Sequence, residues 1–135
     1  RRRGRRRRRL VRRERVREVT TTETSVAQAV ARFSAAFDRR DVDDIMAAMT
    51  EDCVFESTSP PEGVHYEGQL AVRKVWEELF ASSPGARFVS EELFVSGDRA
   101  IGRWRYEWAD GHVRGVDLFR VRDGLVAEKL SYVKG

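Results

Sequence analysis

The sequence predicts a single α+β domain, and three observations lead to this fold class. Apolar residues recur at helical spacing in the first part of the chain, whereas they alternate with polar residues beyond about residue 86. Pairs of glycine and aspartate interrupt the alternating part, which is typical of hairpin turns. Helices are therefore separated along the chain from an antiparallel sheet, as in the α+β class.

The charge of the chain is divided unevenly between its beginning and the rest. Residues 1–18 contain twelve arginines and two glutamates, whereas the remaining 117 residues contain 14 basic and 20 acidic side chains. We expect residues 1–19 to form a disordered Arg-rich extension, because like charges repel and little apolar surface is present. Residues 20–135 are expected to form the domain. The extension either contacts polyanions such as nucleic acid or has no binding role.

Several classes of protein are not expected from this composition. No apolar run approaches the roughly 18 residues that a membrane span requires, so we expect no membrane contact. The single cysteine, Cys53, cannot form a disulfide within the chain, which indicates a reducing compartment such as the cytoplasm. The two histidines, His65 and His112, and this cysteine lack the spacing of metal ligands. We therefore expect neither a metal nor an organic cofactor.

The helical part of the sequence predicts three helices. Thr24 or Ser25 provides the N-cap of the first, which ends near Arg39. Its apolar stripe comprises Val26, Ala29, Val30, Phe33 and Phe37. Asp41 caps a shorter second helix, and Leu70–Phe80 has the apolar spacing of a third.

The remaining segments predict strands and one long loop. A first strand is expected at Cys53–Ser57, and the proline-containing loop Thr58–Gly68 follows it. The four later strands are expected at Arg87–Val95, Ala100–Trp108, Val113–Val121 and Leu125–Val133. Two-residue turns are expected at Asp110-Gly111 and Asp123-Gly124, and they determine which side chains share a face.

Counting outward from these turns places most of the large aromatic residues on one face of the sheet. This face is expected to carry Trp104, Tyr106, Trp108, Val113, Gly115, Asp117, Phe119, Glu128, Leu130 and Tyr132. The helices should pack against it, leaving a hollow where Gly115 has no side chain. Asp117 and Glu128 are then buried, which is costly unless each carboxylate is paired or protonated.

The two acids form the first candidate site. Their Cβ atoms are expected about 7–8 Å apart or less on neighbouring strands. Two acids in an apolar pocket push their pKa values apart, so that one donates a proton and the other accepts one. Trp104, Tyr106 and Tyr132 are expected to orient the ligand. In the alternative interpretation, Asp117 accepts hydrogen bonds and only stabilises the fold. His65, in the loop over the pocket, is either a ligand contact or an exposed histidine.

Five segments of the chain resemble a known family. They are Phe37–Asp43, Glu51–Glu56, Tyr66–Val72, Gly115–Gly124 and Glu128–Tyr132. In this order they resemble SnoaL-like members of the nuclear transport factor 2-like superfamily over roughly residues 24–135. The resemblance implies a cone-shaped fold in which a curved antiparallel sheet wraps round three N-terminal helices. It also implies a deep pocket and frequent homodimers.

The same resemblance implies particular roles in the pocket. Superfamily enzymes such as ketosteroid isomerase, limonene epoxide hydrolase, scytalone dehydratase and polyketide cyclases act without a metal or cofactor. Asp117 takes the place of the acid in ketosteroid isomerase, while Phe33 and Ser57 take the places of its tyrosine and its base. Phe33 cannot donate a hydrogen bond and Ser57 is not basic. The isomerase mechanism is therefore not preserved, and both residues, like Phe119, are expected only to line the pocket.

Together these observations predict a protein that binds a small apolar molecule carrying oxygen. If it is an enzyme, we expect an isomerase, cyclase, dehydratase or hydrolase that uses Asp117 and Glu128 as acid and base. The alternative is a ligand-binding or dimerisation module without catalysis. Val116 and Leu118, on the opposite face of the sheet, favour a homodimer through that face.

Overall fold

The computed structural model describes residues 20–135, so the predicted disorder of residues 1–19 lies outside the described residues. Residues 20–135 form three helices and six strands. In chain order these are α1 (Thr21–Asp38), α2 (Val42–Ala47), β1 (Met49–Glu56), β2 (His65–Glu67), α3 (Gln69–Ser82), β3 (Arg87–Ser96), β4 (Arg99–Trp108), β5 (Gly111–Arg122) and β6 (Leu125–Val133). The α+β class is confirmed.

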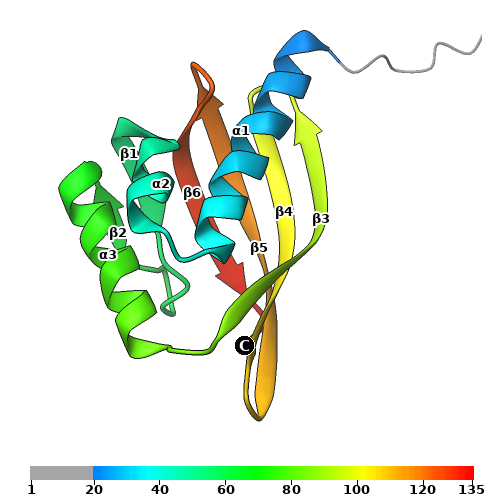
Figure 1. Cartoon of the computed structure of the whole chain (residues 1–135). Coiled ribbons are helices and arrows are strands. Elements are labelled where there is room, and N and C mark those ends of the chain that lie inside the picture. The colour runs from blue at the N-terminus through cyan, green and yellow to red at the C-terminus, as the bar shows by residue number, and fades with distance from the viewer. Residues whose placement is uncertain (1–19) are drawn as a thin grey trace, which may run out of the picture.

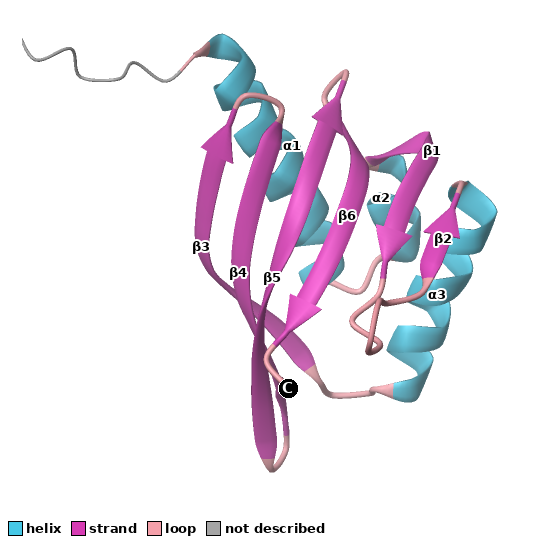
Figure 2. Ribbon diagram, turned by 180° about the vertical axis from the view of Figure 1, so that it is seen from behind, coloured by secondary structure: helices cyan, strands magenta, loops and turns pink. Residues whose placement is uncertain are grey.

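The six strands form one sheet in the order β2-β1-β6-β5-β4-β3. Figures 1 and 2 show it as a curved sheet with the described helices on one face and the other face uncovered. One expectation was wrong. The sheet is mixed rather than antiparallel, because β1 pairs parallel with β6, with Phe55 opposite Lys129. Helix α3 follows the first strand, as its place in the sequence predicted, so only α1 and α2 precede the sheet.

The first helix begins earlier than predicted. Thr20 is its N-cap, and a capping box joins the Thr20 hydroxyl to the backbone N–H of Glu23. This cap satisfies free N–H groups that neither Thr24 nor Ser25 would reach. The predicted stripe is buried, with Phe33 only 2% exposed.

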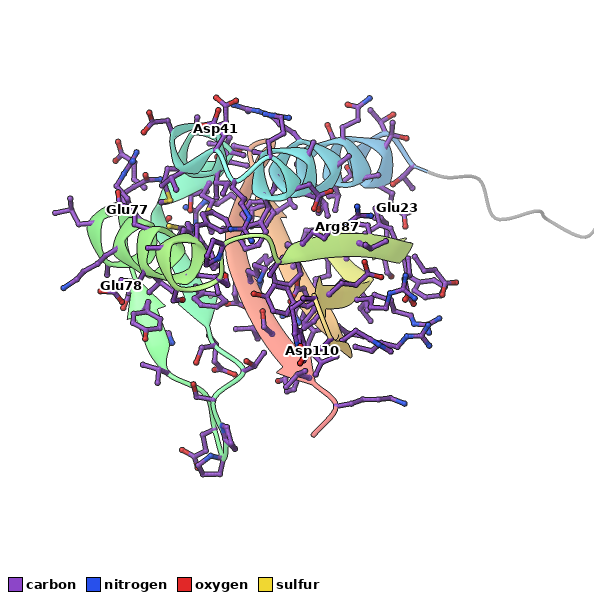
Figure 3. All side chains as sticks on the ribbon, turned by 60° about the horizontal axis from the view of Figure 1, so that its bottom comes forward. Glu23, Asp41, Glu77, Glu78, Arg87 and Asp110 are labelled. Carbon is purple, nitrogen blue, oxygen red and sulfur yellow. The ribbon has the colours of Figure 1, made fainter. Side chains whose placement is uncertain are left out.

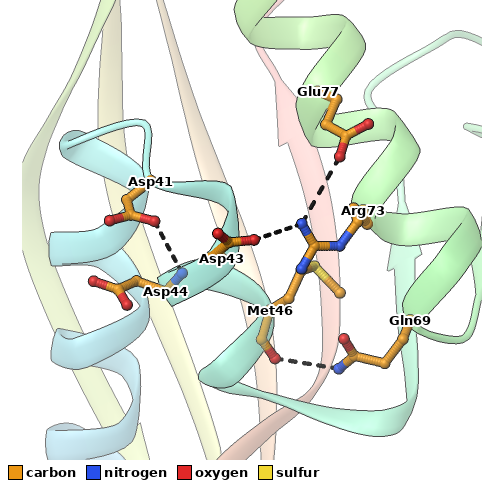
Figure 4. A network of polar contacts seen from close by, with 7 residues as sticks. All are labelled: Asp41, Asp43, Asp44, Met46, Gln69, Arg73 and Glu77. Carbon is orange, nitrogen blue, oxygen red and sulfur yellow. Dashed lines mark hydrogen bonds and ion pairs between the residues drawn. The ribbon is translucent and has the colours of Figure 1, made fainter.

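Polar contacts join α2 to α3 in the way that Figure 4 shows. Asp41 caps α2 as predicted, since its side chain accepts from the backbone N–H of Asp44 at 3.1 Å. Arg73 of α3 bonds Asp43 at 2.8 Å. Gln69, the first residue of α3, donates to the backbone oxygen of Met46 at 3.2 Å. Helix α3 is thereby held beside α2 at one end of the sheet.

The loop between β1 and α3 is shorter than predicted. His65–Glu67 forms β2, with Tyr66 opposite Phe55 of β1. The two rings stack with centroids 6.0 Å apart, which explains why this part of the segment is extended. In the remaining loop the Ser57 hydroxyl accepts from the backbone N–H of Val64 at 2.9 Å.

The hairpin of β4 and β5 extends beyond the helices at one end of the molecule (Figures 1 and 2). Figure 3 turns this end toward the viewer and labels Asp110. Its turn, Ala109-Asp110, lies one residue earlier than predicted, so the pairing shifts by two: Trp108 lies opposite Gly111 instead of Val113, and the Trp108 ring lies against Gly111. A shift of two residues preserves the alternation, so Trp104, Tyr106, Asp117 and Phe119 keep the predicted face.

The hairpin of β5 and β6 differs from the prediction by one residue. Its Asp123-Gly124 turn is as predicted, with Arg122 opposite Leu125 and positive φ at both turn residues. The pairing then shifts, because Val121 lies opposite Val126 but Arg120 lies opposite Glu128. Ala127 is the extra residue of this β-bulge. The bulge exchanges the two faces of β6 beyond it.

The core lies between the helices and the sheet and is rich in aromatic side chains. Phe37 of α1 contacts Trp76, Phe88 and Phe80 with ring centroids 5.1–5.2 Å apart. Edge-to-face contacts of this kind add to the free energy gained by burial. No helix within residues 20–135 combines the length and hydropathy needed to cross a membrane.

Candidate active site

Three polar side chains are buried together on the covered face of the sheet. Asp117, Lys129 and Ser131 are 8%, 7% and 5% exposed. The Lys129 ammonium donates to the Ser131 hydroxyl at 2.9 Å, and this hydroxyl donates to Oδ1 of Asp117 at 2.7 Å. Lys129 Nζ also lies 3.5 Å from Oδ2 of Asp117. We refer to these three residues as the buried triad.

The strand pairing brings the triad together. Asp117 lies opposite Ser131, and Phe119 lies opposite Lys129, on the adjacent strands β5 and β6. Side chains two residues apart on a strand point to the same face, so all three converge. The bulge at Ala127 is what turns Lys129 and Ser131 inward.

Aromatic rings surround the ammonium group of Lys129. Its Nζ lies 4.9 Å from the ring centre of Phe55, 5.3 Å from that of Trp76 and 5.5 Å from that of Phe37. These rings come from β1, α3 and α1, so the sheet contributes one ring and the helices contribute two. Cation–π attraction and the Asp117 carboxylate both favour a charged ammonium here.

Burial acts against that charge. It lowers the pKa of the Lys129 ammonium below its usual value of 10.5, although the charge of Asp117 acts in the opposite direction. A lysine with a lowered pKa gives up its proton more readily than a lysine in water. The triad therefore combines a lysine that releases its proton more readily with a neighbouring carboxylate, which makes it a candidate for acid–base chemistry.

Within residues 20–135, two cavities reach the triad. The first, of about 420 Å³, lies between α1 and strands β3–β5, and Asp117 and Lys129 are among its lining residues. The second, of about 470 Å³, lies between α3 and the β4–β5 hairpin, and Lys129 and Ser131 are among its lining residues. Phe37, Phe88, Trp104 and Lys129 line both. Lys129 is therefore reachable from two sides.

All three tryptophans of the chain line the second cavity: Trp76, Trp104 and Trp108. The indole N–H groups of Trp76 and Trp104 are buried and have no hydrogen-bond partner among the described residues. A buried donor without a partner costs about 1–3 kcal/mol. An oxygen acceptor from a bound molecule would relieve this cost.

Comparison with known proteins identifies the family to which this arrangement belongs. The model of the SnoaL-like domain family matches residues 30–129, most of the chain. The chain belongs to the SnoaL-like family. It is thus a member of the nuclear transport factor 2-like superfamily, and the predicted resemblance is confirmed. No curated protein sequence matches it.

Solved structures support the same family assignment. A nuclear transport factor 2-like protein of unknown function from Mesorhizobium loti is 42% identical, with a TM-score of 0.78, and the match covers 87% of this chain and 98% of the other. A candidate SnoaL-like polyketide cyclase from Jannaschia is 22% identical over 87% and 90%, with a TM-score of 0.74. A candidate ketosteroid isomerase from Kribbella flavida is 21% identical over 87% and 83%, with a TM-score of 0.73. The last two show a shared fold.

Most of the predicted site residues of this SnoaL-like domain do line the two cavities. Phe33, Asp117 and Phe119 line the first, Ser57 and Tyr106 line the second, and Trp104 lines both. Ser57 also holds its loop through the bond to Val64. The Gly115 position is filled, because a Cβ there would lie 2.6 Å from Cη2 of Trp104. The expected empty space at Gly115 is therefore occupied by an indole ring.

Three predicted site residues lie elsewhere. Glu128 and Tyr132 face the uncovered side of the sheet, because the Ala127 bulge reverses this part of β6. The pairing of Asp117 with Glu128 was therefore wrong, and Tyr132, which is 50% exposed, cannot orient a ligand in either cavity. His65 has an exposed side chain, lies 3.8 Å from Glu67 and lines neither cavity.

Lys129 and Ser131 are the site residues that the sequence analysis missed. A bulge that shifts the register by one residue is the known exception to such counting, but neither the turn nor the alternation located it on β6. The available signal was the pair Val126-Ala127, two adjacent apolar residues that interrupt the period of two and are both buried.

The SnoaL-like domain offers little for metal binding within residues 20–135. No group of three or more histidine, cysteine, aspartate or glutamate side chains gathers in this part of the chain. Burial raises the pKa of the Cys53 thiol to about 11, which makes it a poor ligand and nucleophile at neutral pH.

Proposed function

We propose that this protein binds a small, largely apolar molecule with a carbonyl or related oxygen and catalyses proton transfer on it without a cofactor. The observation that carries the proposal is the buried triad at the wall shared by two aromatic cavities. Ion pairs are costly to bury, so a pair placed among aromatic rings beside open volume is a candidate for catalysis.

The two charged partners have complementary roles in such a reaction. The Asp117 carboxylate accepts a proton from the carbon next to a substrate carbonyl. The Lys129 ammonium stabilises the negative charge that develops on the oxygen. The unpartnered indole donors of Trp76 and Trp104 favour the binding of an oxygen-bearing molecule. The isomerase and cyclase named among the similar structures agree with proton chemistry of this kind.

Ligand binding is tested by tryptophan fluorescence, because all three tryptophans line one cavity. The probe is propiophenone, a small aromatic ketone without charge. We expect its titration to change the emission until saturation. A charged molecule of similar size, such as benzoylformate, should bind more weakly, since the lining is mainly apolar. Emission that never responds to apolar carbonyl compounds would contradict the proposal.

Catalysis is tested by the exchange of the α-hydrogens of propiophenone for deuterium, followed by NMR. We expect the protein to accelerate exchange and the Asp117→Asn variant to lose this acceleration. Asp52→Asn is the matched control, because Asp52 is an exposed carboxylate paired to Arg122 on the same sheet. Exchange no faster with the wild-type protein than in buffer would leave it a ligand-binding module, and acceleration that persists in Asp117→Asn would refute the role of Asp117.

We further propose that the uncovered face of the sheet binds a second copy of the chain. A row of apolar residues crosses four strands there, with Phe94 opposite Ile101, Ile101 opposite Leu118 and Leu118 opposite Leu130. Phe94 and Ile101 are 54% and 40% exposed. Such a row favours a symmetric interface.

Sedimentation velocity tests this interface. The wild-type protein should sediment as a dimer, and the Ile101→Lys variant should sediment as a monomer. A monomer at all concentrations would refute the interface.

A further inference from the structure

The lysines of this chain differ sharply in their surroundings. The sequence contains three, and Lys74 and Lys134 are exposed while Lys129 is buried. Lys129 also lines both cavities. A primary amine becomes a useful nucleophile when an apolar site removes it from water and a neighbouring group takes its proton. Lys129 meets both conditions, since aromatic rings enclose it and Asp117 lies 3.5 Å away.

We propose that Lys129 forms a Schiff base with an apolar aldehyde or ketone bound in these cavities. The inference rests on the proposed function, because it requires the cavities to bind a carbonyl compound. It assigns Lys129 a covalent role in place of a purely electrostatic one, and it defines the substrate class as uncharged carbonyl compounds.

The triad contains the groups that each step requires. The Lys129 ammonium first transfers a proton to the Asp117 carboxylate, which leaves a neutral amine. The nitrogen attacks the carbonyl carbon, a C–N bond forms, and a proton passes from nitrogen to the former carbonyl oxygen. The Asp117 carboxylic acid then protonates the hydroxyl, the C–O bond breaks, and water leaves. One ammonium and one carbonyl thus give one iminium and one water, with Asp117 again a carboxylate.

Ser131 connects the two ends of this proton transfer. Its hydroxyl accepts from Lys129 at 2.9 Å and donates to Asp117 at 2.7 Å. A proton therefore has a direct route across 3.5 Å and a second route through the hydroxyl. Burial lowers the pKa of Lys129, which agrees with a readier release of this proton.

The walls define what kind of carbonyl compound fits. Phe37, Phe88 and Trp104 line both cavities, and volumes of about 420 and 470 Å³ accommodate a molecule with one or two rings or a medium aliphatic chain. Asp38, Glu91, Glu92 and Arg103 line only the first cavity, so the penalty for bringing a charge next to these rings applies chiefly in the second. The amine should therefore select apolar aldehydes and ketones.

The test is reductive trapping in the full chain. Hydrocinnamaldehyde and sodium cyanoborohydride are added at neutral pH, and the product is measured by intact mass and peptide mapping. We expect one adduct at Lys129, with the mass of the aldehyde less one oxygen atom. Labelling at Lys129 should exceed that at Lys74 by about tenfold or more, because Lys129, unlike Lys74, has an apolar site and a proton acceptor. Glycolaldehyde, a small polar aldehyde, should not show this preference.

Variants of two lysines provide the controls. Lys129→Arg keeps the positive charge but has no nucleophilic amine, so the adduct should disappear. Lys74→Arg, at a lysine that lines neither cavity, should retain it. If Lys129→Arg does not fold, the double variant Asp117→Asn/Lys129→Met, which removes both charges, replaces it. Labelling spread evenly over the three lysines and the terminal amine would overturn the proposal, and so would an adduct that persists without Lys129.

Fluorescence separates failure of this inference from failure of the proposed function. The same aldehyde is titrated without cyanoborohydride. If the emission saturates but no Lys129 adduct forms, the Schiff base is refuted while ligand binding stands. If neither signal appears, both proposals fail.

Discussion

Two ion pairs on the same sheet have very different surroundings. Lys129 and Asp117 join β6 to β5 on the covered face, with side chains that are 9% and 11% exposed. Arg122 and Asp52 join β5 to β1 at an edge of the core, with side chains 54% and 65% exposed. The Arg122 guanidinium lowers the pKa of Asp52 and thereby holds it charged, but water surrounds both groups. The comparison teaches that charge pairing alone does not identify a functional site; desolvation beside a cavity does.

The largest expected effect is the loss of one buried partner. Lys129→Met leaves the Asp117 carboxylate buried without its cation, which should lower the free energy of unfolding by about 3–5 kcal/mol. Urea denaturation followed by circular dichroism measures this. The double variant Asp117→Asn/Lys129→Met should recover most of the loss, because no buried charge remains. A single variant as stable as wild type would remove the contrast between the two pairs.

A smaller effect is expected from packing beside the buried pair. Gly115→Ala places a methyl group against the Trp104 ring and the backbone oxygen of Tyr132. Overpacking of this kind typically costs about 1–3 kcal/mol. Thermal unfolding and tryptophan emission together check this, since the displaced ring lines both cavities. Gly124→Ala, at an exposed turn with positive φ, is the control for the loss of a glycine, and it should leave the emission unchanged.

The buried pair should also give the stability a pH dependence. Because the folded state lowers the pKa of Lys129 below 10.5, the unfolded chain binds this proton more tightly. Unfolding free energy should therefore rise as the pH increases from the lowered pKa toward 10.5. The Lys129→Met variant lacks this rise, so its deficit relative to wild type should widen with pH. A deficit that stays constant would mean that the pKa of Lys129 is not lowered.

The smallest effect is expected at the exposed pair. Asp52→Asn and Arg122→Gln should leave the melting temperature unchanged, because water solvates each charge when its partner is lost. Neither variant should alter ligand binding, since neither residue lines the two cavities. A loss comparable to that of Lys129→Met would show that exposure does not distinguish the two pairs.

The sequence was sufficient to predict the helices, five of the six strands and the inward position of Asp117. These features depend on local signals, namely apolar spacing, the Asp41 cap and the Asp123-Gly124 turn. The error of two residues in the pairing of β4 with β5 did not matter for the site, because side chains alternate with a period of two. The parallel pairing of β1 with β6 and the strand β2 depend on tertiary contacts such as Phe55 on Tyr66, which no local pattern specifies.

The composition of the candidate site could be predicted only in part, for one physical reason. Every assignment on β6 beyond Val126 depended on unbroken alternation, and one extra residue invalidates it. The error replaced Lys129 and Ser131 with Glu128 and Tyr132. An ammonium and a hydroxyl thus take the place of a second acid and a phenol, which changes the predicted chemistry from a carboxylate dyad to an amine–carboxylate pair.

The Ala127 bulge has a consequence for how such pockets diversify. Deleting this one residue would restore regular pairing and present Glu128, Leu130 and Tyr132 to the interior, with Lys129 and Ser131 in water. The strand therefore encodes two alternative sets of reactive groups, and strand register selects which set a ligand meets. Insertions and deletions within strands are then a route to new activities in this architecture. They change which residues face the pocket without substituting any of them.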